Sequence, residues 1–337
     1  MKLLLISTLT KPLQTEFYGP VESHVRFVAK ELGKRGHDVW VVALKGTQPE
    51  EFKVVEVEGE EGKAFEIYKK MLNQFDAVMD FSSLKYTIVH KHDENPDLKL
   101  ICPCYPYQAI GYQTSPPIPF PNFIATSDAM AQAMSAKLGC AFRVVHYFPS
   151  PIPDGFEASK ERSDRLLFLG RFEKTKGVQE AVDLARQLRI GLDLAGEDVL
   201  VSDQRFTVLL LQKADGRLVR VYGKVNESLK HELLAKAKAL VLPYLEDSVA
   251  WTCQTILEAF QHGIPVITMN RGAVNEFVKN GTNGFVCNRL EDLSEAVKKI
   301  DEIKSEACIQ SAKEFNLEET VNKYQSLIRQ VVEQQEW

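Results

Sequence analysis

The feature that most constrains this chain is an alternation of short apolar runs with amphipathic helical stretches, which occurs twice along the sequence. In the first third, the apolar run KLLLIST precedes residues 20–35, whose apolar side chains recur at helical spacing, and HDVWVVAL and FKVVEVE follow. From Arg165 the rhythm restarts with RLLFLGRF, GVQEAVDLARQL and GLDLAGE. Because strands that alternate with helices form parallel sheets covered on both faces, the sequence predicts an α/β fold.

A proline-rich and polar stretch, PSPIPDGFEASKERSD, separates the two blocks and has the composition of a linker. We therefore predict two Rossmann-like, doubly wound domains, at residues 1–155 and 156–317, with a cleft between the carboxyl ends of their sheets. A length of 337 residues is sufficient for two cores. An amphipathic helix over residues 318–337 is expected to pack back onto the first domain.

Composition argues against several classes of protein. The net charge is -5 and the basic residues are scattered, so no nucleic-acid partner is expected. Six cysteines are too few for a disulfide scaffold, and Cys102 and Cys104 have no partners at zinc spacing, so no metal site is expected. The start MKLLLISTLTKP favours a first strand over a signal peptide, and no run approaches the ~20 apolar residues of a membrane span. A cytoplasmic protein is expected, with peripheral membrane contact left open.

Loops that follow strands are the places to look for a ligand site. The stretch YGPVESH follows the first strand, and Gly19 allows close backbone approach just before a helix whose N-terminus attracts anions. An ordinary tight turn is the alternative. The stretch GRFEKTKG is more specific, because Gly170, Arg171 and Lys176 lie between a strand and a helix, where two cations suit a diphosphate. The alternative is two solvated surface cations.

Glu258 is the single carboxylate of the run SVAWTCQTILEAFQHGIPVITMN. A lone acid on the buried side of a helix is costly unless something satisfies it. Such a carboxylate can accept hydrogen bonds from two ribose hydroxyls, whereas the alternative is that it caps a neighbouring loop. Downstream, Gly272 stands just before another predicted helix, where backbone N–H groups can meet phosphate.

Several of these stretches together resemble the large family of retaining GT-B glycosyltransferases, which includes sucrose-phosphate synthases and bacterial and archaeal mannosyl- and glucosyltransferases. The stretches are YGPVESHVRFVAKELGKRGHDVWVVA, FLGRFEKTKGVQEAV, VYGKVNESLKHELLAKAKALVLPY, ILEAFQHGIPVI and RGAVNEFVKNGTNGFV. The resemblance implies a GT-B fold, an active site between two Rossmann domains and a nucleotide-diphosphate sugar as donor. It also implies a final helix that returns to the first domain.

Residue by residue, Arg171 and Lys176 match the phosphate-binding pair of this family. Glu258 matches the second glutamate of its Glu-seven residues-Glu motif, which holds the ribose. Gly19 matches a glycine of the first-domain loop at the diphosphate.

Three departures from the family pattern stand out. The first motif glutamate is replaced by Ala250, with Glu246 and Asp247 nearby but out of register, and the usual Phe-Gly-Leu is TCQ, residues 252–254. The nearest substitutes for the missing carboxylate are backbone N–H groups at the start of the predicted helix, where such groups have no partner within the helix. These N–H groups belong to Trp251, Thr252, Cys253 and Gln254.

The third departure concerns the first-domain histidine that commonly contacts the donor sugar. Tyr105 stands about where that histidine is expected, while His90 and His92 lie in VHKHDENPD, which the sequence suggests is a polar loop.

The resemblance implies retaining transfer of a hexose from a nucleotide-diphosphate sugar to a carbohydrate, lipid or small-molecule acceptor. Arg171 and Lys176 would stabilise the leaving diphosphate without a metal, and the donor would be a substrate, not a cofactor. The alternative is a catalytically silent relative that acts as a scaffold or partner subunit, and Ala250 favours it. A GT-B nucleotide-sugar epimerase is a third alternative, and it fits less well because the stretch GRFEKTKG resembles transferases.

Overall fold

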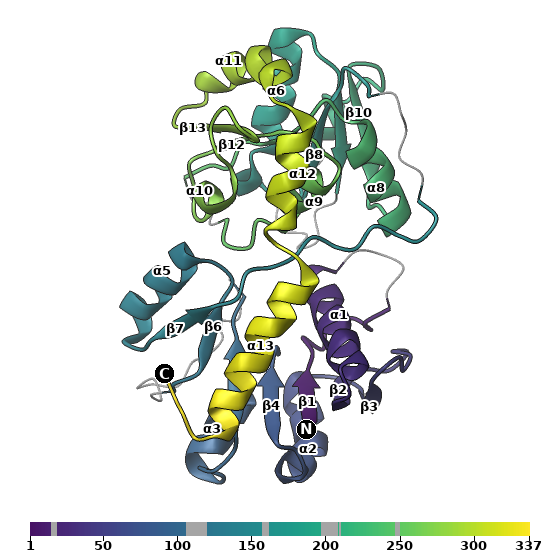
Figure 1. Cartoon of the computed structure of the whole chain (residues 1–337). Helices are drawn as coiled ribbons and strands as arrows, with labels where there is room; N and C mark the ends of the chain where they lie inside the picture. The colour runs from purple at the N-terminus through teal and green to yellow at the C-terminus, as the bar shows by residue number, and fades with distance from the viewer. Residues whose placement is uncertain (15–18, 106–119, 157–161, 197–207, 209, 247–249) are drawn as a thin grey trace. The chain divides into compact units, whose positions relative to one another are not determined.

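The computed structural model describes residues 1–14, 19–105, 120–156, 162–196, 208, 210–246 and 250–337. Within these ranges the chain forms two compact units, each with its own sheet (Figure 1). The first unit contains residues 1–14, 19–148 and 316–337, and the second contains residues 149–315. Residues 106–119 lie outside the described residues, as does Asp247.

The first unit is built on a seven-stranded sheet in the order β3-β2-β1-β4-β5-β6-β7, and all its neighbouring strands are parallel. Its strands are β1 (Lys2–Ile6), β2 (Asp38–Leu44), β3 (Lys53–Val57), β4 (Ala77–Asp80), β5 (Leu100–Pro103), β6 (Phe123–Ala125) and β7 (Phe142–Val144). The order reverses between β1 and β4, so this unit is doubly wound, as the sequence predicts.

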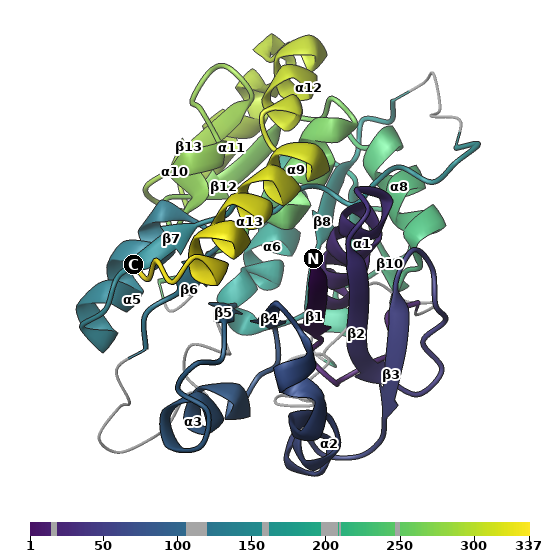
Figure 2. The same cartoon turned by 60° about the horizontal axis from the view of Figure 1, so that its bottom comes forward.

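The first unit also contains five α-helices and one 3-10 helix among its described residues. They are α1 (Pro20–Lys34), α2 (Glu61–Tyr68), η1 (Lys69–Gln74), α3 (Tyr86–Asp93), α5 (Asp128–Leu138) and α13 (Leu317–Val332). Figures 1 and 2 show α1 and α13 beside each other, and their apolar faces share one core with β1 and β2. Because α13 adds Val321, Tyr324 and Ile328 to that core, the end of the described chain completes the unit in which the chain starts.

The interpretation of VHKHDENPD as a polar loop is wrong for its first residues, because His90 and His92 lie in α3. The helix has only two buried residues, Thr87 and Ile88, so its apolar pattern is too short to recognise in the sequence.

The second unit has a six-stranded parallel sheet in the order β10-β9-β8-β11-β12-β13. Its strands are β8 (Leu166–Leu169), β9 (Leu192–Ala195), β10 (Val219–Gly223), β11 (Ala239–Leu242), β12 (Val266–Met269) and β13 (Gly284–Cys287). The order reverses between β8 and β11. Ligands of open α/β sheets bind at such a reversal, outside the carboxyl ends of the strands.

The helices of the second unit connect these strands. They are η2 (Lys174–Lys176), α6 (Val178–Leu188), α8 (Glu227–Lys236), α9 (Gln254–Gln261), α10 (Val274–Phe277), α11 (Asp292–Lys299), η3 (Ile300–Glu302) and α12 (Ser305–Lys313). Asn226 caps α8, because its side chain accepts a hydrogen bond from Leu229 N at 2.9 Å. Among the described helices of both units, none combines the length and apolar character that crossing a membrane requires.

Candidate functional site

Three loops of the second unit meet at the carboxyl edge of its sheet, where the strand order reverses. They follow β8, β11 and β12, which are neighbours in the sheet, and they carry most of the residues that the sequence singles out. The candidate site is built within this unit from residues 170–177, from described residues between 243 and 254, and from residues 270–273.

The loops after β8 and β11 are packed backbone against backbone. Gly177 has φ +73°, and a Cβ atom there would lie 1.9 Å from the carbonyl oxygen of Pro243. Leu245 N donates to Thr175 O at 3.0 Å and fixes the same pair of loops. Only glycine fits at position 177, so the sequence motif GRFEKTKG has a structural reason for its last residue.

Arg171 and Lys176 are the cations of this loop, and both are half-buried. The Arg171 Nη1 atom lies 2.6 Å from Glu173 Oε1, and Lys176 Nζ lies 5.2 Å from the ring centroid of Tyr244. Burial lowers the pKa of Lys176, the nearby charge of Arg171 lowers it further, and Glu173 opposes the shift. The charges of Arg171 and Lys176 therefore influence each other.

The loop after β11 leads into α9 through a residue with an unusual backbone. Cys253 is the N-cap of α9 with φ +48°, a left-handed conformation that is uncommon for residues other than glycine, and its side chain caps no backbone N–H group. Burial raises the pKa of its thiol well above the ordinary range, so Cys253 stays protonated. Thr252, beside it, is half-buried.

The backbone of Ala250 is held by the loop after β12. Ala273 N donates to Ala250 O at 2.8 Å, and a Cβ atom on Gly272, which has φ +58°, would lie 2.6 Å from the same oxygen. Gly272 is thus needed for this close approach. Ala250 is buried, whereas Glu246 is an exposed side chain 3.7 Å from Arg271. Arg271, the residue before Gly272, has a buried Nε atom with no hydrogen-bond partner among the described residues.

Glu258 is fully buried on α9 and has one partner that the sequence reasoning missed. Lys230 Nζ, on α8, donates to Glu258 Oε1 at 2.8 Å, and Lys230 is itself fully buried. Glu258 Oε2 is buried and has no hydrogen-bond partner within the part of the chain that the structure describes. The signal was present in the sequence, because Lys230 shares helical spacing with Leu233 and Leu234, which are core residues.

Gln254 lies one turn before Glu258 on the same helical face and is also buried. Its Nε2 atom is 3.4 Å from Ser150 Oγ, and its Oε1 atom has no hydrogen-bond partner in the described ranges. The two residues therefore present two unpaired acceptor oxygens on one face of α9.

In the first unit, Gly19 immediately precedes α1. A Cβ atom at this position would lie 2.7 Å from Glu22 Oε2, so glycine leaves room for the Glu22 side chain. Glu22 is buried, and its Oε1 atom accepts hydrogen bonds from the hydroxyls of Thr8 and Thr10. Gly170, by contrast, has ordinary space around it, since a Cβ atom would lie 3.8 Å from the Phe168 ring.

The histidines of the first unit take different positions. His24 on α1 is buried, its Nε2 atom lies 3.0 Å from Tyr324 Oη, and burial lowers its pKa to about 3. Tyr105 packs in the same aromatic cluster, with its ring centroid 6.4 Å from that of His24. His90 and His92 lie in the last turn of α3, near the amino edge of the sheet, because α3 leads from the end of β4 to the start of β5.

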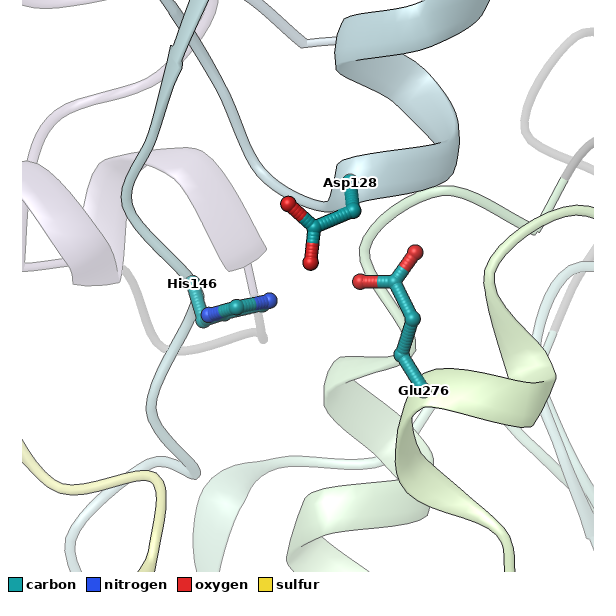
Figure 3. Close-up of side chains that lie close together, drawn as sticks. All are labelled: Asp128, His146 and Glu276. Atoms are coloured by element: carbon teal, nitrogen blue, oxygen red, sulfur yellow. The ribbon is translucent and has the colours of Figure 1, made fainter.

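One further pair of polar residues lies within the first unit. Figure 3 shows that the ring of His146, which follows β7, points toward the carboxylate of Asp128 at the start of α5. Their nearest ligand atoms lie within 4.8 Å. Two such ligands are fewer than the three or four that zinc sites use. The third labelled residue of the figure, Glu276, belongs to α10 of the second unit.

Comparison with known proteins adds a family match. Residues 154–316 match the family described as glycosyl transferases group 1. The glycogen synthase of Mycobacterium tuberculosis is 32% identical over 143 residues, which are 39% of this chain and 32% of that protein. An uncharacterised 41.2 kDa protein from the cps region of Klebsiella pneumoniae is 26% identical over 179 residues, 50% of this chain and 46% of that protein. The chain thus matches less than half of the length of these relatives.

Solved structures match the whole chain. AviGT4, a glycosyltransferase involved in avilamycin A biosynthesis, aligns with TM-score 0.74 and 19% identity over 100% of this chain and 99% of its own. Sucrose-phosphate synthase from Thermosynechococcus elongatus aligns with TM-score 0.75 and 16% identity, over 98% of this chain and 99% of its own. Anabaena HepE in complex with UDP and glucose aligns with TM-score 0.71 and 15% identity, over 98% of this chain and 99% of its own. The predicted fold of two parallel-sheet, Rossmann-like units of the GT-B type is confirmed.

Proposed function

We propose that this chain, whose residues 154–316 match the glycosyl transferases group 1 family, transfers a hexose from a nucleotide-diphosphate sugar with retention of configuration. The observation that carries the proposal is the loop after β8, where the half-buried cations Arg171 and Lys176 lie on a loop packed against the loop that leads into α9. The donor is a substrate, and its diphosphate is the group that these cations suit. The acceptor is a hydroxyl of a carbohydrate, lipid or small molecule.

The cations have a defined role in such a reaction. The bond between the anomeric carbon and the diphosphate breaks, negative charge grows on the leaving oxygen, and the acceptor oxygen forms the new bond on the same face. The acceptor proton passes to the departing diphosphate. Fixed donors that face a developing charge lower the barrier, and removal of one costs about 10²–10³ in rate. Arg171 and Lys176 supply two such donors, and the N-terminus of α9 adds its positive dipole end.

The nucleoside has acceptors on α9. Glu258 Oε2 and Gln254 Oε1 are buried oxygens for which the described residues supply no hydrogen-bond partner, and each can accept a hydrogen bond from a ribose hydroxyl. Two cations at the diphosphate also remove the need for a bridging metal. We therefore expect activity to persist in excess EDTA.

A silent relative is the second candidate, and Ala250 favours it. The side chain at this position has no polar atom, and its backbone oxygen already accepts from Ala273 N. A transferase without this carboxylate must read the sugar through other groups, so we expect a donor preference that differs from common glucose or mannose donors.

One incubation separates the two candidates. The protein is mixed with uridine, guanosine and adenosine diphosphate sugars, and free nucleoside diphosphate is measured over hours. A transferase releases the diphosphate from its own donor slowly by hydrolysis, and faster when an acceptor is present. A silent partner subunit releases none above the rate in buffer.

A further inference from the structure

The buried pair of Lys230 and Glu258 has a feature that a purely structural ion pair does not need. Lys230 Nζ donates to Glu258 Oε1 at 2.8 Å and to Glu227 Oε2 at 2.9 Å, so one ammonium bridges two carboxylates. Lys230 and Glu258 are both fully buried. The second oxygen of Glu258 is equally buried, and no described residue forms a hydrogen bond with it.

Burial of these charges is difficult to explain by stability alone. Moving two charges out of water costs about as much as their attraction returns, and well-packed apolar residues serve as well or better in many proteins. An unpaired carboxylate oxygen in the same place adds a further cost. Buried polar atoms without partners are rare in native proteins, and each one needs an explanation such as a ligand or a water molecule.

The surroundings of the pair show which groups share its charge. Burial alone would raise the pKa of Glu227, but the nearby His231 ring, whose Nε2 atom lies 3.7 Å from Glu227 Oε2, and the hydrogen bonds and charge of Lys230 lower it overall. His231 Nδ1 lies 2.8 Å from His262 Nε2, and burial lowers the pKa of His262 to about 4, so His262 is neutral near pH 7. Lys230 is therefore the ammonium that faces two carboxylates within this buried group.

The arrangement leaves one oxygen of Glu258 committed and the other available. Because Lys230 fixes Oε1, the carboxylate cannot rotate about its last bond without breaking that contact. Oε2 is then held in one place, on the helical face that also carries the unpaired Oε1 atom of Gln254. Pre-organised acceptors bind more tightly than mobile ones, because no rotamer freedom is lost on binding.

We propose that Lys230 is a positioning residue, which holds Glu258 so that its free oxygen accepts a hydrogen bond from the nucleoside of the donor. This inference rests on the proposed function, because it assigns the nucleoside to α9. It adds a residue on a neighbouring helix that acts only through Glu258. It also explains why a lysine occupies a buried position of α8, on the side of the helix that carries the core residues Leu233 and Leu234.

The test is a double-mutant cycle on nucleotide binding with the full chain. Wild type is titrated by calorimetry with uridine, guanosine and adenosine diphosphates, and the tightest of the three becomes the probe. Lys230→Met, Glu258→Gln and the double variant are then compared. We expect each single variant to bind the probe about tenfold more weakly or worse, the effect of losing a hydrogen bond to a charged group. The double variant should match Glu258→Gln within about twofold, because Lys230 acts through that carboxylate.

Two controls separate positioning from general damage. Lys236→Met removes an exposed lysine of the same helix, whose Nζ atom lies 2.5 Å from Glu232 Oε1, and should leave binding unchanged. Inorganic pyrophosphate, which has no ribose, should bind wild type and Lys230→Met equally. If Lys230→Met does not fold, the double variant is compared with Glu258→Gln alone, and equal binding supports the proposal.

Several results would overturn the inference. Lys230→Met that folds and binds the probe as wild type does would show a purely structural lysine. A double variant that binds at least about tenfold more weakly than Glu258→Gln would show that Lys230 acts by another route. Wild type that binds none of the three nucleotides would remove the proposed donor site itself, and the inference with it.

Discussion

Arg171 and Lys176 stand on one short loop with a third cation, Lys174, which is exposed. We expect Arg171→Ala and Lys176→Ala each to reduce turnover about 10²-fold or more, because a fixed donor at a developing charge is lost. Lys174→Ala is the matched control and should keep turnover near the wild-type value. The measurement compares the steady-state rates of the variants and of wild type with the preferred donor. Thermal melting verifies that each variant is folded. Normal turnover in a folded Arg171→Ala/Lys176→Ala variant would contradict the assignment.

His24 gives a second prediction at the scale of one residue. Its folded pKa of about 3 lies below the ordinary 6.5, so the unfolded chain binds a proton that the folded chain does not. Stability from this group is complete above pH 6.5 and is lost as pH falls toward 3. Between pH 7 and pH 4 the loss amounts to about 3 kcal/mol, at about 1.4 kcal/mol for each unit of pKa shift.

Urea denaturation at pH 7 and pH 4 measures this loss. We expect His24→Phe to lose about 3 kcal/mol less than wild type between the two pH values, because the variant has no imidazole to protonate. His92→Gln changes an exposed histidine and should behave as wild type does. An identical loss in wild type and His24→Phe would show that this histidine does not limit acid stability.

The site residues differ in how far the sequence could identify them. Arg171, Lys176 and Gly177 form a local motif between a strand and a helix, so both their place and their packing follow from adjacent residues. Lys230 contacts Glu258 across 28 positions, and no local pattern links them. Its helical spacing with Leu233 and Leu234 marks it as buried, but only the packing of α8 against α9 supplies the partner.

At the scale of elements, the loop after β8 depends on a glycine whose place no other residue can take. Gly177 has φ +73°, and a Cβ atom would lie 1.9 Å from the Pro243 oxygen, whereas Gly216 has φ +70° with open space around it. We expect Gly216→Ala to cost about 1–2 kcal/mol, the penalty for a left-handed residue with a side chain. Gly177→Ala should cost about twice that or more, because the backbones must also separate.

Chemical denaturation of both alanine variants measures the difference. Nucleotide affinity gives a second reading, because Gly177→Ala moves the loop that carries Arg171 and Lys176, while Gly216→Ala leaves that loop unchanged. Equal losses of stability in the two variants would contradict the close approach of the loops after β8 and β11.

Long elements with a clear period could be predicted, and short ones could not. Residues 20–35 place five apolar side chains on one face, and α1 forms there. By contrast, α3 buries only Thr87 and Ile88, and it was expected to be a loop. The helix expected over GAVNEFVKNG is confined to Val274–Phe277, and β13 begins soon afterwards at Gly284. Tertiary packing decides such short segments, and the local sequence does not contain it.

At the scale of the whole molecule, the repeated alternation of strands and helices along the sequence is sufficient to predict the doubly wound sheets. Both sheets are parallel and reverse their strand order once, as doubly wound sheets do. In the second unit, β8 and β11 are at the reversal, and they precede the loops that carry Lys176 and Cys253. The position of the candidate site therefore follows from the strand order. The two loops leave neighbouring strands in the middle of the sheet, at the point where the order reverses.

The most direct test of the account is release of nucleoside diphosphate from a panel of nucleotide sugars by wild type and by Lys176→Ala. The account predicts slow release from one preferred donor, faster release with an acceptor, persistence of the activity in EDTA, and a loss of about 10²-fold in the variant. A folded wild-type protein that releases no diphosphate from any donor, and binds no nucleoside diphosphate, would contradict it.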